Sequence, residues 1–460
     1  MTIDKQLLNT LRTIVGAEYV STDAGVCLTY GTDALGRGQA ADVVVMPADA
    51  AHVSAIAKAC FETNTPMVPR GGGTGYTGGA VPLHGGVVIS LERLNRIIEI
   101  DEGNLLAVVE PNVITGDLQD AVERLGLFYP PDPASLRRSA IGGNVAENAG
   151  GPRAFKYGVT RQYVLGLEAV LANGDVIRTG GKVVKNVVGY DLTQLLVGSE
   201  GTLAILTKIV LRLIPKPPAR ATLRATFADV PRAVNAVTGI VAARVIPAAL
   251  ELIDAECLAA VSTYLKGRTL APPNTGALLL VEVDGGAEQV EAEAARVAQA
   301  CQDAGASQVL RAETESEREE LWQVRREISP SLKVITPLKF NHDVVVPKAR
   351  VPQLFELVAK LRKSHGLRIP CFGHVGDGNI HVNIMASPDD PAEIQRAHFA
   401  ERALFAGVIA LEGSISGEHG IGFAKAPYLG MELTPETIAV MRAVKQAFDP
   451  TGILNPGKIF

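Results

Sequence analysis

The chain has 460 residues, of which 47% are hydrophobic and 20% charged, an ordinary globular composition that argues against disorder. Its 44 basic and 49 acidic residues give a net charge of −5 without a basic tail or stripe, so nucleic acid is not an expected partner. The five cysteines form no CxxC pair, which argues against a disulfide framework, a thiolate zinc site and an iron–sulfur cluster. We expect them to be small buried side chains.

The first half of the chain is predicted to alternate short strands and helices. Residues 3–14 space their apolar side chains as an amphipathic surface helix does, and they show no signal-peptide pattern. We expect residues 129–151, rich in Gly and Pro, to be irregular, and residues 164–215 to alternate short strands with turns. The other predicted elements are a strand at 42–47, a helix at 50–64, a strand at 66–70, a glycine-dense turn at 71–86, strands at 86–91 and 105–111, and a helix at 113–126 with Thr115 or Asp117 near its N-cap.

A proline run at residues 215–218 predicts a domain boundary, because stacked prolines suit neither a helix nor a central strand. Beyond it we expect a second α+β domain, and a terminal helix at about 435–448. Its alanine-rich helical patterns and strand patterns alternate, with helices at 230–245 and 287–305 and strands at 277–285, 342–347 and 378–385. Nowhere do 18 apolar residues follow one another, so we expect no membrane span and a cytoplasmic location.

The densest glycine cluster contains Gly73-Thr-Gly75-Tyr-Thr-Gly78, which matches the GxGxxG pattern. A dinucleotide-binding turn of the Rossmann type should open a helix, whereas here Pro82 and a strand-like segment follow. So many glycines still allow consecutive backbone N–H groups to converge on an anion such as a phosphate. The alternative is a tight corner without a ligand.

Five sequence blocks of the chain are distinctive: PRGGGTGYTGGAVP (69–82), PPDPAS (130–135), IGGNVAENAGG (141–151), YGVTRQYVLGLEAVLANGD (157–175) and VVGYDLTQLLVGSEGTLAI (187–205). In these blocks the chain resembles the FAD-binding domain of the vanillyl-alcohol oxidase/p-cresol methylhydroxylase (PCMH) superfamily. Within it, the chain is similar to the branch of glycolate oxidase D-subunits, D-lactate dehydrogenases and D-2-hydroxyglutarate dehydrogenases.

The resemblance implies an α+β architecture with a two-part PCMH-type FAD-binding domain and a cap domain built on an antiparallel sheet with flanking helices. The expected divisions are an N-terminal helical segment at 1–37, the FAD-binding domain at 38–217, the substrate or cap domain at 218–434, and a C-terminal helix and tail returning to the flavin at 435–460. Residues 70–81 contain no His that could tether the flavin, so noncovalent FAD is expected. The implied cofactor contacts are Pro69, Arg70, Gly71, Gly72, Gly73, Thr74, Gly75, Thr77, Gly78, Gly79, Pro131, Asp132, Ser139, Gly142, Gly143, Asn144, Gly150, Glu200 and Asn455.

Two glycine-rich segments of the second half carry a candidate metal site. In GHVGDGNIHVN, His374 and His381 flank a turn that leads into a strand, with His381 and Asn383 on one face. Two neutral imidazoles and the carboxylate of Glu418 make a ligand set for a divalent ion, zinc first, with iron or manganese as alternatives. A purely structural polar cluster is the other interpretation. By the resemblance, these three residues are the metal ligands and His419 is the catalytic base.

A 2-hydroxy acid substrate also requires cations or amides for its carboxylate. The resemblance assigns this role to Arg325, Lys339 and Asn383, although the spacing around Lys339 departs from that of the hydroxyglutarate-type relatives. Arg326 could instead pair with glutamates on its own helix. Four further histidines are expected to have surface or packing roles: His52, His84, His365 and His398. The sequence assigns no role to His342, which lies near Lys339.

The implied function is an FAD-dependent dehydrogenase of a short D-2-hydroxy acid, with D-lactate ahead of glycolate. The alternatives are a D-2-hydroxyglutarate dehydrogenase, a flavin subunit of a multi-subunit glycolate oxidase complex, or a metal-independent alcohol or sugar oxidase. Electrons would pass to oxygen or a separate acceptor: a quinone, a cytochrome, an electron-transfer flavoprotein or an iron–sulfur subunit. Such a partner could bring the protein to the inner membrane peripherally, and a homodimer is compatible with the sequence.

Overall fold

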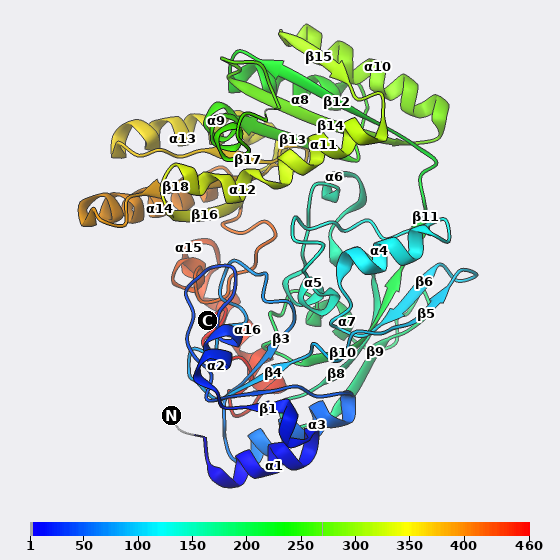
Figure 1. Ribbon diagram of the computed structural model, residues 1–460, viewed down its shortest axis with the longest axis vertical. Helices are drawn as coiled ribbons and strands as arrows, with labels where there is room; N and C mark the ends of the chain where they lie inside the picture. The colour runs from blue at the N-terminus through cyan, green and yellow to red at the C-terminus, as the bar shows by residue number, and fades with distance from the viewer. Residues whose placement is uncertain (1–2, 269) are drawn as a thin grey trace. The chain divides into compact units, whose positions relative to one another are not determined.

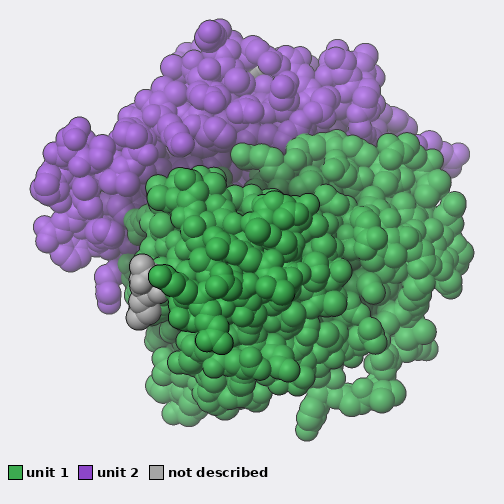
Figure 2. All heavy atoms as spheres, turned by 60° about the horizontal axis from the view of Figure 1, so that its bottom comes forward, with its two compact units in different colours: residues 1–150, 159–216, 418–460 green, residues 151–158, 217–417 purple. Residues whose placement is uncertain are grey.

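The computed structural model describes residues 3–268 and 270–460, which divide into two compact units (Figures 1 and 2). Unit 1 contains residues 3–150, 159–216 and 418–460, and unit 2 contains residues 151–158 and 217–417. Apart from the short excursion at 151–158, the chain passes to unit 2 within the proline run at 215–218 and returns to unit 1 at Glu418. No helix in the described ranges combines the length and apolar character needed to cross a bilayer.

The first sheet of unit 1 consists of four short strands in the order β1-β2-β4-β3. Their bounds are β1 Val20–Ser21, β2 Val43–Val45, β4 Val87–Ser90 and β3 Met67–Arg70, and the last three run parallel. Helices α1 (Lys5–Val15) and α3 (Ala50–Glu62) bury Leu11 and Ile56 in the same core as Val43. The predicted strands and helices of this region are confirmed.

The second sheet of unit 1 is antiparallel, in the order β5-β6-β10-β8-β9. Its strands are β5 Ile97–Asp101, β6 Leu106–Val109, β10 Ile205–Arg212, β8 Val164–Val170 and β9 Val176–Gly180, and a two-stranded sheet pairs β7 Leu127–Phe128 with β11 Ile214–Pro215. The remaining helices of unit 1 are η1 Ala17–Tyr19, α2 Ala24–Tyr30, α4 Thr115–Glu123, α5 Ile141–Glu147, η2 Thr160–Tyr163, α7 Leu192–Leu196, η5 Ala426–Tyr428, α15 Leu429–Glu432 and α16 Pro435–Phe448.

Helix α4 begins where predicted: its N-cap is Ile114, Thr115 is its first residue, with its hydroxyl bonded to Ser139, and Asp117 lies in the first turn. One prediction in unit 1 was wrong. Helix α5 lies in the segment that was predicted to be irregular. That prediction followed from its two glycines, which disfavour a helix. Packing explains this helix: a Cβ on Gly142 would lie 2.6 Å from the Pro111 Cβ, so only glycine allows the close approach.

Unit 2 is built on a seven-stranded antiparallel sheet in the order β15-β12-β14-β13-β17-β18-β16 (Figure 1). Central strand β14 is buried along nearly its whole length, so helices cover both faces of the sheet. The strands are β15 Gln308–Arg311, β12 Ala219–Phe227, β14 Ala277–Gly285, β13 Ala249–Asp254, β17 Cys371–His374, β18 Asn379–Ala386 and β16 Leu338–Val345. The helices are α6 Ala154–Tyr157, α8 Val230–Ala242, α9 Ala255–Tyr264, α10 Ala287–Asp303, α11 Glu315–Arg326, α12 Ile328–Ser331, η3 Leu332–Val334, η4 Lys348–Arg350, α13 Val351–His365 and α14 Pro391–Ala410.

The C-terminal tail joins the first sheet of unit 1. Leu454 forms a parallel bridge with Met67 of β3, and the Asn455 N–H donates to the Met67 carbonyl at 2.7 Å. Strand β3 ends at Arg70, where the glycine loop begins. The tail thus supports the strand from which that loop emerges.

Candidate functional site

The glycine loop of unit 1 lies against a second glycine-containing segment. A Cβ on Gly72 would lie 2.4 Å from the Arg138 carbonyl oxygen, and one on Gly71 would lie 3.2 Å from the Ala140 Cβ and 3.8 Å from the Gly143 nitrogen. The fold therefore brings together the residues predicted from the 69–82 and 130–151 blocks. Glycine at these positions allows the two segments to pack this closely.

The donor and acceptor chemistry of this region fits a dinucleotide. Asn112 Oδ1, beside Gly71, and Arg70 Nη1 are buried atoms without a hydrogen-bond partner. Buried polar atoms are normally satisfied, so such a pair points to a bound group that offers both an acceptor and a donor. Ser139 and Asn144, by contrast, are bonded to Thr115 in the protein.

Residues from the end of the chain complete the same loop. Asn455 Nδ2 donates to the carbonyls of Gly79 at 2.8 Å and Glu200 at 2.7 Å. The Glu200 carboxylate accepts the N–H groups of Ile421 and Gly422, both at 2.7 Å, and burial raises its pKa. Glu200 and Asn455 therefore hold the main chain around the predicted cofactor, and their contact with FAD stays a prediction.

His419, the predicted base, lies on the glycine loop within unit 1. Its carbonyl oxygen accepts from the Thr77 hydroxyl at 3.1 Å, and its ring centroid is 5.2 Å from that of Tyr76. Its side chain is largely buried, at 16% exposure. A proton acceptor is therefore held beside the segment predicted to bind the cofactor.

The two predicted metal-binding histidines occupy neighbouring strands of unit 2. Phe372 of β17 pairs with His381 of β18, and His374 lies two positions after Phe372, so both imidazoles project from one face of the sheet. One ring nitrogen of each histidine lies within 4.8 Å of the other, and both side chains are buried. A strand pairing, not a helical face, thus brings together residues seven positions apart.

A buried carboxylate orients the first histidine. Glu251 of β13 is directly opposite His374, and its Oε1 lies 2.5 Å from His374 Nδ1. Its Oε2 accepts from Arg325 Nε of α11 at 2.7 Å, so Arg325, predicted to bind substrate, is also the counterion of this carboxylate. Burial by itself would raise the pKa of Glu251, but Arg325 and His374 outweigh it and lower the pKa to about 2.

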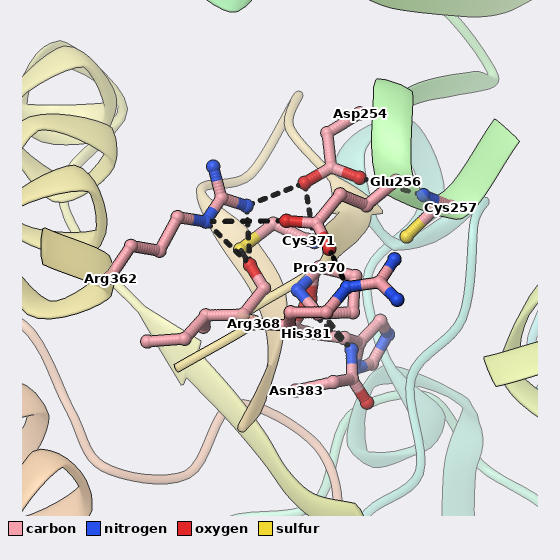
Figure 3. A network of polar contacts seen from close by, with 10 residues as sticks. Asp254, Glu256, Cys257, Arg362, Arg368, Pro370, Cys371, His381 and Asn383 are labelled. Carbon is pink, nitrogen blue, oxygen red and sulfur yellow. Dashed lines mark hydrogen bonds and ion pairs between the residues drawn. The ribbon is translucent and has the colours of Figure 1, made fainter. Parts of the chain in front are cut away.

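A second polar network holds the start of β17 (Figure 3). Asp254 accepts the Cys371 N–H and Arg362 Nη2, both at 2.8 Å, while Asn383 Nδ2 donates to the Pro370 carbonyl at 3.2 Å. Both atoms of the Pro370–Cys371 peptide group are therefore bonded by side chains. Burial raises the pKa of Asp254 despite the Arg362 charge.

Asn383 has little capacity left for substrate. Its Nδ2 also donates to the His381 carbonyl at 3.1 Å, and its Oδ1 accepts from Asn341 at 2.8 Å. An amide has two N–H donors, and here both are used by protein carbonyls. Its predicted substrate contact would have to use the remaining lone pair of Oδ1.

Lys339 lies on the same sheet face, but not beside the histidines. Asp343 is the residue directly opposite His381. Lys339 lies four positions before Asp343, about 13 Å away along the strand. Its Nζ donates to the Ser329 carbonyl and hydroxyl, and among the described residues it contacts no carboxylate. Burial and nearby Lys333 lower its pKa to about 8.

The remaining residues considered have structural partners. Arg326 pairs with Glu319 on its own helix, as one alternative predicted. His342 lies 3.4 Å from a Glu401 oxygen and against the Phe405 ring. All five cysteines are buried and reduced, as expected.

Sequence reasoning did not identify Glu251, Asp254 or Arg362 as site residues. In ALELID, Glu251 alternates with two leucines, a pattern typical of a strand with one solvent-exposed face. The structure buries that face beneath α9, α11 and α12. Only the pairing of β13 with β17 reveals what the carboxylate binds.

Two family models match the chain. The FAD binding domain matches residues 41–180, and the C-terminal domain of FAD linked oxidases matches residues 216–459. The chain is 43% identical over 459 residues to the glycolate oxidase subunit GlcD of Bacillus subtilis. The alignment covers 100% of this chain and 97% of that protein. The chain is 40% identical over 420 residues to a D-lactate dehydrogenase of Archaeoglobus fulgidus, with 91% of each chain covered.

The fold is also similar to that of solved structures. The structure of p-cresol methylhydroxylase with substrate bound has a TM-score of 0.82, covering 99% of this chain and 96% of that one at 19% identity. At this identity the likeness concerns the fold. It confirms the predicted PCMH-type architecture.

We predict that Glu251→Gln destabilises the protein and flattens its acid sensitivity. Because the folded pKa of Glu251 is lowered to about 2 from 4.5, its stabilising contribution is present above pH 4.5 and is lost as the pH falls towards 2. The amide leaves Arg325 without its buried counterion, which should lower the free energy of unfolding by about 3–5 kcal/mol at pH 6. Urea unfolding followed by circular dichroism at pH 6, 4 and 3 measures both effects.

The control is Glu319→Gln, which removes an exposed ion pair on the same helix as Arg325 and should change the free energy of unfolding by at most about 1 kcal/mol. Equal pH dependence of the wild type and Glu251→Gln would contradict the prediction.

Proposed function

Because the chain belongs to the family of FAD-linked oxidases, we propose that it oxidises a short D-2-hydroxy acid to the 2-oxo acid, with D-lactate ahead of glycolate. The observation that carries this proposal is the pair of imidazoles on one sheet face, with Glu251 and Arg325 directly beside them. The relatives named as a glycolate oxidase subunit and as D-lactate dehydrogenases support the substrate class.

The donor set suits a divalent metal, with zinc as the first choice and iron or manganese as alternatives. Glu251 occupies Nδ1 of His374, which leaves Nε2 as the metal-binding atom, the common arrangement in which a carboxylate orients a histidine ligand. His381 supplies a second nitrogen nearby. Two imidazole nitrogens and a carboxylate, with an open position for substrate, are a frequent catalytic set.

We infer that Glu418 supplies the carboxylate. Gly417 donates its N–H to the Asp343 carbonyl at 2.7 Å and to Asp343 Oδ2 at 3.0 Å, and Asp343 is the register partner of His381. Consecutive Cα atoms are about 3.8 Å apart, so the residue after Gly417 is held close to this strand pair by covalent geometry alone. His419 follows directly, which links the predicted base to the same segment.

FAD held at the glycine loop would supply the hydride acceptor for C2 of the substrate, and a metal held by His374 and His381 would acidify the substrate hydroxyl. The chain itself would orient the acid and remove its proton. Arg325 uses Nε and Nη2 on Glu251, which leaves its Nη1 hydrogens for the substrate carboxylate. His419 Nε2 would accept the hydroxyl proton, because imidazole is the side chain suited to that task near neutral pH.

One observation favours a second candidate, D-2-hydroxyglutarate. Lys339 is a half-buried cation without a carboxylate partner among the described residues, several positions along the strand from the histidines. Among the acids considered, only one with a second carboxylate would offer this cation a charged partner. Against it, the relatives named above bear the names of glycolate and lactate enzymes.

We also propose a separate electron acceptor. The relative from Bacillus subtilis is named as a subunit of glycolate oxidase, which supports a flavin subunit that passes electrons to a partner. A quinone, a cytochrome, an electron-transfer flavoprotein and an iron–sulfur subunit are the acceptor classes considered.

Substrate choice is tested by anaerobic reduction of the flavin. D-lactate should bleach the visible flavin band fastest, glycolate more slowly and L-lactate not at all, because only one face of C2 is presented to the flavin. Stopped-flow spectra with each acid, and with D-2-hydroxyglutarate, measure this. Fastest bleaching by D-2-hydroxyglutarate would reject the short-chain proposal in favour of the second candidate.

The metal set is tested by composition. His374→Ala and His381→Ala should each reduce bound metal per chain, measured by inductively coupled plasma mass spectrometry, and weaken metal binding at least tenfold in a chelator competition. His398→Ala, which changes a half-exposed histidine of the same unit, is the control. Unchanged metal stoichiometry in all three variants would reject these ligands.

The base is tested separately from cofactor binding. His419→Ala should slow flavin reduction about 10²–10⁴-fold at pH 7, the usual contribution of a positioned base, while the FAD content stays at the wild-type value. His84→Ala, an exposed histidine of the same unit, should reduce its flavin normally. Flavin reduction at the wild-type rate in His419→Ala would remove the residue from the mechanism.

A further inference from the structure

The glycine loop is contacted by a buried carboxylate from the N-terminal segment. Asp33 follows α2 and is only 8% exposed. Its Oδ1 accepts the Leu35 N–H at 3.0 Å, whereas its Oδ2 is buried without a hydrogen-bond partner. Asp33 precedes residues 41–180, which match the FAD binding domain model.

The unpartnered oxygen faces the loop. A Cβ on Gly75 would lie 3.9 Å from Asp33 Oδ2, and one on Gly73 would lie 2.2 Å from Arg70 Nη2. Asp33 and Arg70 are close enough to interact electrostatically, yet Arg70 Nη1 also lacks a hydrogen-bond partner. One buried acceptor and one buried donor are thus left over along the same stretch of glycine loop.

The other charged groups nearby do not satisfy these two atoms. Tyr30 donates to Glu92 Oε2 at 2.7 Å, and Lys458 donates to the Val81 carbonyl at 2.7 Å. Burial raises the pKa of Asp33 to about 6, even though the N–H groups of Leu35 and Gly78 and the charges of Arg70 and Lys458 oppose the shift. The carboxylate therefore lies where burial disfavours its charge.

A ligand that satisfies both atoms must offer a donor to Asp33 and an acceptor to Arg70. A phosphate alone would repel the carboxylate, but a flavin dinucleotide carries hydroxyl groups beside its phosphate oxygens. We propose that Asp33 is a cofactor-binding residue that accepts a hydrogen bond from a sugar hydroxyl of FAD, while Arg70 donates to an adjacent oxygen. The hydroxyl belongs either to the adenosine ribose or to the ribityl chain.

The test is the FAD affinity of protein stripped of flavin and refilled at pH 8, where Asp33 is ionised. Asp33→Ala should weaken FAD binding about ten- to a hundredfold, measured by flavin fluorescence titration, since a hydrogen bond to a charged group is lost. Asp23→Ala is the matched control, because it removes the capping carboxylate of α2 and loosens the same segment without touching the loop. Its FAD affinity should equal that of the wild type.

Titrations with ADP and FMN identify the hydroxyl. A loss of affinity shared by FAD and ADP places Asp33 on the adenosine ribose, and a loss shared by FAD and FMN places it on the ribityl chain. If Asp33→Ala does not fold, Asp33→Asn serves instead: with its oxygen on the Leu35 N–H, the amide presents an NH2 group where the charged Oδ2 stood, so the charge-assisted hydrogen bond to FAD is lost and the affinity should fall. Wild-type FAD affinity in a folded Asp33 variant would overturn the proposal.

Discussion

The candidate site of unit 2 depends on the contacts of the ionised Glu251 carboxylate with Arg325 and His374. The carboxylate is fully buried in the centre of a β-sheet, where a lone charge is prohibitively unfavourable. Arg325 from a covering helix and His374 from the adjacent strand make it stable, and each is oriented in return. A residue resembling a solvent-facing glutamate in the sequence therefore connects the sheet, the covering helix and the first histidine.

In unit 1, too, distant segments hold the predicted binding element in place. The glycine loop has few side chains of its own, so its shape comes from groups contributed by distant segments. Asn455, Glu200 and Thr77 hold its backbone or the chain that lies on it. In each unit, the candidate residues thus lie on simple local elements whose geometry is imposed by partners far away in the sequence.

This explains what could be predicted from the sequence. Strands such as β2 and β14 and helices such as α10 follow from local periodicity, and the glycine loop with its two histidine-bearing segments follows from recognisable blocks. Helix α5 was not predictable, because it exists through close packing on Pro111 against the preference of its glycines. The partner of Arg325 was not predictable either, since it is set by strand register rather than by spacing along the chain.

Because the ribosome makes the chain from its N-terminus, the division into two units affects the order in which they can fold. Unit 1 contains the first segments of the chain to be made but is closed by the tail, through the bridge between Met67 and Leu454. At roughly 5–20 residues per second, the 217–417 segment takes roughly 10–40 s to make, and unit 1 stays incomplete for all of it. Unit 2 can therefore fold first, and the glycine loop gains its final supports only after residues 418–460 have been made.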